Sequence, residues 1–436
     1  MTTLRSQGGL VIPMDVEQIA KQYLVGGVNS PVRSLKGLVP KGLFIEKADG
    51  PYLYANQKSY LDLVCGFGPH ILGHQHPAVR KALQSAIDQG FCPGATQAAE
   101  VKLAQHICQK IPSMECLRLV NSGTEAAITA VRLARAITGR SAILKFAGGY
   151  HGHLDSCLVS AGSGAMTCGT PSSPGVLAAV AKQTFVVPYN DLAAVRQVMQ
   201  THGQQIAAVL VEPVAGNMGC IPPAEGFLSG LRQLCDQAGS MLVFDEVMTG
   251  FRVHQYAAQL RYNITPDLTL LGKIIGGGLP IGALGGKREY LNRLAPVGDV
   301  YQAGTFSGHA LSCAAGLAVL QYMQAHQVID VIERRVQHWL AELGALAKRY
   351  GVPMQTSQVG GMFGAFFTEQ PVLQLADIDQ ASVLRFKAWF KACLDNGIYW
   401  PPSAYEAGFV SYVHDEAVLD ASLVPLAKAF KQLTYA

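Results

Sequence analysis

The middle of the chain alternates short apolar runs with longer amphipathic segments. Helix-length segments such as 124–139 and 225–239 separate the apolar runs at 117–120, 141–146, 206–213, 241–247, 268–272 and 281–286. Short apolar runs joined by helices are typical of a mostly parallel sheet with helices on both faces. The sequence therefore predicts an α/β fold.

Length and composition narrow the class of protein. The chain has 436 residues, of which 49% are apolar and 15% charged, against roughly 25% charged in an average soluble domain. Such a chain buries a large core, which excludes a mini-protein and intrinsic disorder. The net charge is only +4 and no basic run is present, which excludes nucleic acid and membrane surfaces as partners. We expect small molecules or a second copy of the chain instead.

The pattern changes along the chain and predicts three parts. Residues 1–70 contain a hairpin-like stretch at 52–68 and few helices, so we expect them to pack with the smaller domain. Residues 71–320 hold the alternating pattern and are predicted to form the large domain. Residues 321–436 are predicted to form a small α+β domain with helices near 329–351, 382–397 and 415–433.

Cysteine usage and hydropathy bear on the compartment. The ten cysteines are scattered without a CxxC pair, so we expect reduced, mostly buried thiols. No stretch reaches the roughly 18 apolar residues of a membrane span, and the first residues lack a long apolar segment. We therefore expect a cytoplasmic protein. His151 and His153 have no third ligand at a suitable spacing, so no metal site is expected.

Polar residues at the ends of the apolar runs are the candidate functional residues, because ligands of parallel α/β sheets bind beyond the carboxyl ends of the strands. Ser122, Gly123 and Thr124 follow one run and open an alanine-rich helix. The N–H groups and dipole of a helix N-terminus bind phosphate, and glycine lets the backbone approach closely. The same residues also fit an ordinary helix cap.

Two further candidates lie at the same predicted edge. Asp245 suits a metal, a ribose, a protonated ring nitrogen or a helix cap. Lys273 precedes Gly276-Gly277-Gly278, and a lysine desolvated there can form a Schiff base, although most lysines are solvated surface residues. A phosphate cradle, a carboxylate and a Schiff-base lysine together suit pyridoxal phosphate, whose ring withdraws electrons while its nitrogen stays protonated. The three candidates therefore indicate a pyridoxal phosphate enzyme.

Motifs over nearly the whole chain resemble those of the glutamate-1-semialdehyde 2,1-aminomutases, which are class III aminotransferases. NSGTEA at 121–126, DEV at 245–247 and GK at 272–273 are shared across class III. The motifs typical of the aminomutases are GGVNSPVR at 26–33, a GSG to TPSSPG segment at 162–175, VAGNMG at 214–219 and YEAGF at 405–409. The resemblance implies a fold type I pyridoxal-phosphate-dependent transferase.

The resemblance also implies roles around the cofactor, pyridoxal 5'-phosphate or its pyridoxamine form. Lys273 would form the internal aldimine and move the proton, and Asp245 would pair with the pyridine nitrogen. Tyr150 would stack on the ring, Val247 would pack on its opposite face, and Asn217 would hydrogen-bond the ring hydroxyl.

The phosphate and the second subunit involve other residues. The resemblance implies a homodimer with active sites at the subunit interface, where Thr305 reaches in from the second subunit and the phosphate is held by Ser122, Gly123 and Thr124. A transient contact with the enzyme that supplies the semialdehyde is a further expectation, although no partner motif is visible.

At the substrate end, Ser30 and Arg33 match the segment that contacts the substrate carboxylate in the aminomutases, and the resemblance implies that Ser163 belongs to a mobile loop that closes over the site. Phe67 would form an aromatic wall. Glu406 resembles the acidic residue near the substrate amino groups. Without the resemblance, Arg33 would read as a surface charge and Glu406 as a turn cap.

Three positions depart from the aminomutase pattern. Phe67 replaces a usual Trp, His309-Ala310 replaces Asn-Pro, and Ala147 replaces an acidic residue. The resemblance implies conversion of glutamate 1-semialdehyde, (S)-4-amino-5-oxopentanoate, to 5-aminolevulinate for tetrapyrrole (porphyrin) biosynthesis. The alternatives are an intermolecular class III ω- or β-amino acid aminotransferase, which needs a keto acid, and a non-catalytic homologue that carries the cofactor.

Overall fold

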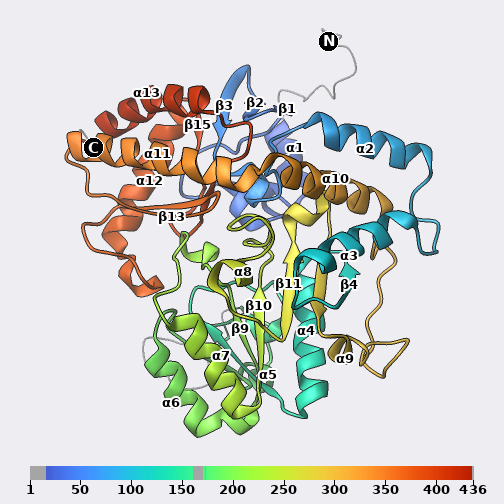
Figure 1. Ribbon diagram of the computed structural model, residues 1–436. Coiled ribbons are helices and arrows are strands. Elements are labelled where there is room, and N and C mark those ends of the chain that lie inside the picture. Colours follow the sequence, from blue (N-terminus) through green and yellow to red (C-terminus); the bar gives the residue numbers. More distant parts are fainter. Residues whose placement is uncertain (1–15, 161–169, 172, 435–436) are drawn as a thin grey trace.

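Seven strands form the main sheet of the computed structural model, which describes residues 16–160, 170–171 and 173–434 (Figure 1). In spatial order they are β4 (Cys116–Val120), β12 (Gly282–Gly286), β11 (Leu268–Gly272), β10 (Met241–Asp245), β9 (Ile206–Val211), β5 (Ala142–Phe146) and β8 (Thr184–Val187). β12 runs antiparallel to both of its neighbours, and every other neighbouring pair is parallel. The predicted mostly parallel sheet is thus confirmed.

Helices cover both faces of this sheet, which explains why its strands are continuously apolar. α4 (Gly123–Thr138) packs on the face that carries Ile143 and Val243. On the opposite face, Leu144 and Leu242 pack against α6 (Leu192–His202) and α7 (Phe227–Ala238). A strand with helices on both sides buries alternate side chains in opposite directions, so an apolar residue is favoured at every position.

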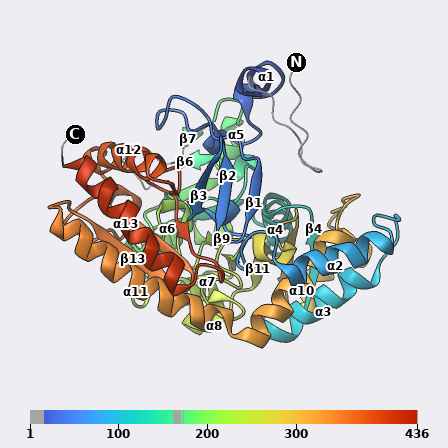
Figure 2. The ribbon, with the colours of Figure 1, turned by 90° about the horizontal axis from the view of Figure 1, so that it is seen from above.

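The hairpin predicted at 52–68 is confirmed and pairs with a distant segment. β1 (Lys47–Asp49), β2 (Tyr52–Ala55) and β3 (Lys58–Asp62) are antiparallel, and Asn56 and Gln57 both have positive φ in the tight β2–β3 turn. β15 (Ile398–Tyr399) adds to this sheet parallel to β3. The N-terminal strands therefore lie beside C-terminal elements (Figure 2).

The C-terminal part combines three long helices with a small sheet. The helices predicted from the sequence are confirmed as α11 (Val328–Arg349), α12 (Gln380–Asp395) and α13 (Glu416–Leu433). The sheet consists of β13 (Gln355–Val359), β14 (Met362–Phe366) and β16 (Gly408–Phe409). Trp339, Trp389 and Trp400 pack together in the core between these elements.

The remaining elements connect these parts. The longer helices are α1 (Val16–Tyr23), α2 (Pro77–Asp88), α3 (Ala98–Lys110) and α10 (Ala310–His326). The shorter helices are α5 (Ala178–Ala181), α8 (Ala258–Tyr262) and α9 (Arg288–Leu291), and a two-stranded sheet joins β6 (Val159–Ser160) to β7 (Thr170–Pro171). The 3-10 helices are η1 (Val25–Gly27), η2 (Pro31–Ser34), η3 (Cys65–Phe67), η4 (Asp155–Cys157), η5 (Gly203–Gln205), η6 (Gly216–Met218), η7 (Lys273–Gly276) and η8 (Leu375–Asp377).

The predicted boundary at residue 320 falls inside α10, so we propose a boundary at Gln327, where α10 ends and α11 begins. We propose to keep the first boundary near residue 70. Among the helices of the described residues, none combines the length and apolarity that a membrane span requires. The nine cysteines in the described part of the chain are free thiols.

Candidate active site

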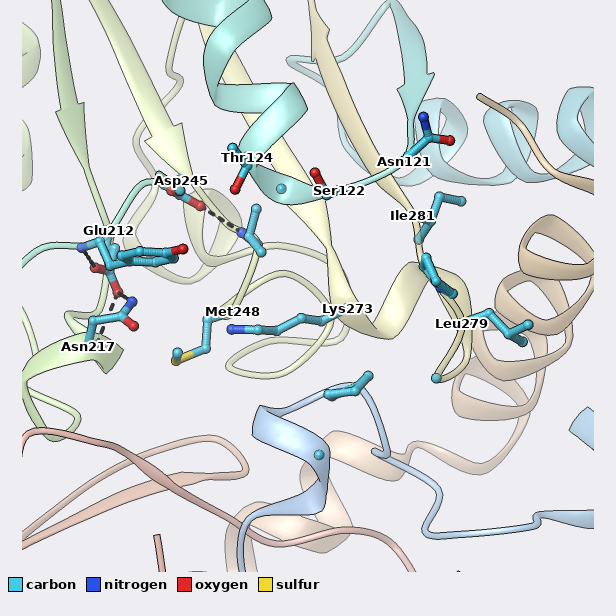
Figure 3. A pocket seen from close by; sticks show the side chains of 18 residues that line it. Asn121, Ser122, Thr124, Glu212, Asn217, Asp245, Met248, Lys273, Leu279 and Ile281 are labelled. Atoms are coloured by element: carbon cyan, nitrogen blue, oxygen red, sulfur yellow. Dashed lines mark hydrogen bonds between the residues drawn. The ribbon is translucent and has the colours of Figure 1, made fainter. Parts of the chain in front are cut away.

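A cavity of about 400 Å³ opens where β10 and β11 end and α4 begins (Figure 3). Eight of the residues singled out from the sequence line it: Ser122, Gly123, Thr124, Tyr150, Asn217, Asp245, Val247 and Lys273. The structure therefore brings together residues that lie up to 151 positions apart in the sequence. Asp245, Glu212 and Asn217 lie on one side in Figure 3, and Asn121, Leu279 and Ile281 lie on the other.

The start of α4 can bind an anion and is also capped. Ser122 is the N-cap, and its Oγ accepts a hydrogen bond from Glu125 N over 3.2 Å. The N–H groups of Gly123 and Thr124 have no acceptor among the described residues. A Cβ on Gly152 would collide with Thr124, so glycine lets the loop after Tyr150 approach the helix start. Both interpretations made from the sequence are therefore compatible.

Tyr150 and Val247 present apolar surface to the cavity. Tyr150 leaves 52% of its surface exposed there. The Val247 side chain packs against the start of α4, and a Cβ on Gly123 would lie 2.9 Å from Val247 Cγ2. The glycine at 123 therefore gives room for the valine.

Asp245 ends β10 and is only 5% exposed. Its Oδ2 is 2.8 Å from Nδ1 of His151, whose side chain is fully buried, and its Oδ1 accepts a hydrogen bond from Val247 N over 3.1 Å. From the sequence, His151 was a possible metal ligand, and its contact with Asp245 was not predicted. No group of three or more metal-ligating side chains is suitably placed within the described residues.

Glu212 is a second buried carboxylate that the sequence analysis missed. Its Oε1 accepts from Tyr150 N over 2.9 Å, and its Oε2 accepts from Gly216 N over 3.0 Å and from Asn217 Nδ2 over 2.9 Å. Burial raises the pKa of Glu212. Like Asp245, Glu212 follows an apolar run, so its position after the strand was the signal that could have found it.

Lys273 is the first residue of η7 and has a positive φ of 50°. Its side chain extends across the cavity toward Met248 (Figure 3). Burial lowers the pKa of Lys273, whereas Glu406, Glu212 and Asp245 act to raise it. The net shift is downward, which favours a neutral, nucleophilic amine.

Glu406 lies close to Lys273, although it does not line the cavity. Burial raises the pKa of Glu406 to about 7, which the nearby Lys273 opposes and Glu212 reinforces. The carboxyl group can therefore change charge near neutral pH. Glu406 is the acidic residue that the sequence analysis expected near the substrate amino groups.

The structure does not bring the other four described candidates into the cavity wall. Arg33 is exposed and lines a separate cavity beside α1, and Ser30 precedes η2 in the same region. Phe67 is half-buried in η3 next to the lining residue Gly66, and Thr305 is exposed on the surface. Ser163 lies outside the described residues.

Residues 36–407 match the model of a protein family described as aminotransferase class-III. The chain belongs to the class III aminotransferase family. The predicted membership of class III and the predicted fold type are therefore confirmed. Members of this family are typically homodimers that act on small molecules.

Solved structures of other class III aminotransferases are similar over almost the full chain. An omega-transaminase from Sphaerobacter thermophilus is 28% identical, with a TM-score of 0.91 and coverage of 96% of this chain and 97% of that chain. A beta-phenylalanine aminotransferase from Variovorax paradoxus is 32% identical, with a TM-score of 0.84 and coverage of 94% and 91%.

A glutamate-1-semialdehyde aminomutase from Pseudomonas aeruginosa PAO1 has the same fold. Its TM-score is 0.86 with 96% and 94% coverage, and it was also solved in complex with PMP. Its identity to this class III aminotransferase is 21%, so the likeness shows the fold alone.

Proposed function

We propose that the protein is a glutamate-1-semialdehyde 2,1-aminomutase. It would convert (S)-4-amino-5-oxopentanoate to 5-aminolevulinate through 4,5-diaminovalerate, without a second keto acid. The observation that carries the proposal is the carboxyl group of Glu406, which lies partly buried near Lys273. An aminomutase must hold a molecule with two amino groups, and this carboxylate provides a counter-charge for the amine that is not reacting. The motifs at 26–33, 214–219 and 405–409 support the same reaction.

Pyridoxal 5'-phosphate, which alternates with its pyridoxamine form, is the cofactor, and the donor set of the cavity fits it. Free N–H groups at the start of α4 suit a phosphate, the open Tyr150 ring suits stacking, and Lys273 provides an amine. When bound, the cofactor withdraws electrons from the carbon next to the reacting amine. Each residue role below is part of the proposal.

Asp245 would keep the ring nitrogen of the cofactor protonated. The contacts from His151 Nδ1 and Val247 N hold its two oxygens in one orientation. Glu212 holds Asn217 Nδ2, which leaves the remainder of the Asn217 amide free for the ring hydroxyl. The two carboxylates thus orient groups toward different parts of the ring.

Lys273 would bind the cofactor and carry the proton between the reacting atoms. Burial lowers the pKa of its amine, which favours the neutral form that can accept a proton. Glu406 would accept hydrogen bonds from the second substrate amine when ionised. The chain itself therefore supplies both the base and the counter-charge.

We propose that a second copy of the chain covers the surface around Thr305. Large apolar side chains are exposed near it, namely Phe306 at 59%, Tyr301 at 72% and Phe91 at 51%. His309, at one of the departures from the aminomutase pattern, lies against both Phe91 and Phe306. Exposed aromatic clusters favour a protein interface. Homodimerisation would carry Thr305 toward the partner's cavity, and a transient contact with the semialdehyde-producing enzyme is a further proposal.

The second candidate is an intermolecular ω- or β-amino acid aminotransferase. Two observations favour it: the transaminases reported above are 28% and 32% identical, and three consecutive apolar residues line the cavity. These residues are Leu279, Pro280 and Ile281. This activity would share the cofactor and Lys273 but would consume a keto acid.

One assay separates the two reactions. The purified protein in its pyridoxamine form is incubated with glutamate 1-semialdehyde without any added amino acceptor. Many molecules of 5-aminolevulinate per active site are expected. Turnover that requires stoichiometric pyruvate or 2-oxoglutarate would refute the aminomutase and support the transaminase, with Lys273→Ala as the inactive control.

A further inference from the structure

Arg252 is a buried cation without an anion beside it. The side chain is 0% exposed and belongs to none of the ion pairs of the described residues. Its Nη1 donates to Gly361 O over 3.4 Å and its Nη2 donates to Gly68 O, while Nε has no partner among the described residues. The guanidinium carbon lies 4.9 Å from the centre of the Phe409 ring. An unpaired buried charge is costly to folding, so its presence calls for a compensating role.

Arg252 connects three segments that are far apart in the sequence. It belongs to the turn after β10, Gly68 follows η3, and Gly361 lies between β13 and β14. Gly361 N also donates to Arg252 O over 3.1 Å, so Gly361 is bound through both its N–H and its carbonyl. The arginine therefore fixes the N-terminal and C-terminal segments against the end of the main sheet.

Gly68 links Arg252 to Lys273. Gly68 has a φ of 115°, which glycine adopts readily, and a Cβ there would lie 3.3 Å from Lys273 Cδ and 3.4 Å from Phe409 Cε1. The Gly68 backbone therefore fits between the lysine side chain and the phenylalanine ring. Gly66 and Pro69 of the same turn line the cavity. The carbonyl that Arg252 binds thus belongs to the backbone that supports the lysine chain.

We propose that Arg252 is a positioning residue for Lys273, which holds the turn at 66–69 along the lysine side chain and brings an unneutralised positive charge close to that side chain. The inference rests on the proposed role of Lys273 in binding the cofactor. It adds a residue that is not among those lining the cavity.

The titratable groups around Lys273 and Arg252 do not neutralise the positive charge of Arg252. Around Lys273, the carboxyl groups of Glu406, Glu212 and Asp245 favour the ammonium form, and Arg252 opposes them together with burial. Around Arg252, burial raises the pKa of the Cys65 thiol well above its usual value. Burial lowers the pKa of His70 to about 4, so this imidazole is neutral at pH 7. Arg252, whose own pKa burial lowers to about 10, stays charged at that pH.

The test is a pH titration of the holoenzyme, followed by the visible absorbance of the bound cofactor. Arg252→Gln removes the charge and retains hydrogen-bond donors. We expect the titration midpoint to rise by about one pH unit, because a nearby cation disfavours protonation of the Lys273 nitrogen. Arg252→Lys keeps the charge, so its midpoint should stay within about 0.3 units of the wild type. Arg261→Gln removes a cation paired with Glu333 and should change nothing.

Equal midpoints for Arg252→Gln and the wild type would overturn the proposal, as would a one-unit rise in Arg252→Lys. If Arg252→Gln does not fold, the kcat and the titration midpoint of Arg252→Lys still test the proposal. A lysine cannot bridge Gly68 and Gly361, so its kcat should fall about tenfold with an unchanged midpoint. An unchanged kcat would overturn the positioning role. The titration needs only bound cofactor, so a protein that titrates as expected but forms no 5-aminolevulinate refutes the proposed function alone.

Discussion

His151 Nδ1 lies 2.8 Å from Asp245 Oδ2 beneath the cavity, and both side chains are buried. Because the carboxylate accepts, the imidazole is the donor in this contact. The second carboxylate oxygen accepts a hydrogen bond from Val247 N, so the carboxylate group is held in one orientation. This fixed orientation makes the charge at residue 245 separable from its geometry by mutation.

Asp245→Asn should leave the cofactor bound but lower kcat by roughly two orders of magnitude or more. A neutral amide has nearly the same shape but cannot keep the ring nitrogen protonated. Cofactor content is measured by absorbance and kcat by 5-aminolevulinate formation. Asp236→Asn, on an exposed carboxylate, is the control. A normal rate in Asp245→Asn would assign this residue a structural role only.

Lys273→Ala should fold and still retain cofactor through the start of α4, yet show no turnover. The reason is that no other lysine lines the cavity among the described residues. Borohydride reduction of the wild type followed by peptide mapping should label Lys273. Label found on a different lysine would contradict its assignment.

The rate should depend on pH through Glu406. Burial raises the pKa of this carboxyl to about 7, so it is ionised above that pH and protonated below it. Because only the ionised form attracts the second substrate amine, kcat/KM should fall as pH falls through about 7. In Glu406→Gln this fall of kcat/KM at acidic pH should vanish, and kcat/KM itself should decrease by a factor of roughly ten or more. An identical limb in the variant would assign the titration to another group.

Glu246 should contribute to stability. This fully buried carboxyl accepts from Ala258 N, Gln259 N and Thr249 Oγ1, which fixes the start of α8 to the end of β10. Glu246→Ala should lower the free energy of unfolding by about 3 kcal/mol, since it leaves several buried donors unpaired. Glu225→Ala, on an exposed glutamate, should change it by less than about 0.5 kcal/mol. Urea unfolding measures the free energy of unfolding of both variants, and equal losses in Glu246→Ala and Glu225→Ala would contradict the prediction.

The main sheet could be predicted because its strands are buried on both faces and read as apolar runs. Asp245 and Lys273 could be found because they follow such runs, where sheet topology gathers ligand-binding groups. The contact between His151 and Asp245 could not be found, since 94 positions separate them and nothing local encodes the pairing. The contacts of Arg252 could not be predicted either, because Gly68 and Gly361 are also far from it in the sequence.

At the substrate end, the sequence pointed to residues that the single chain does not bring to the cavity. The resemblance points to Arg33 and Thr305 for the site, but in a single chain Arg33 lines a separate cavity beside α1 and Thr305 is exposed. Thr305, which the resemblance assigns to the site of a second subunit, has no partner in one chain. The roles of both residues stay predictions that the oligomer will test.

The pairing of β3 with β15 bears on how the protein is made. Ile398 aligns with Leu61, so this sheet lacks its last strand until residues 398–399 have been synthesised, more than 300 residues after β3. Glu406 and Phe409, which flank Lys273 and Gly68, emerge from the ribosome later still. The cofactor site therefore matures only after residues 398–409 have emerged, and until then a nascent chain exposes the edge of β3.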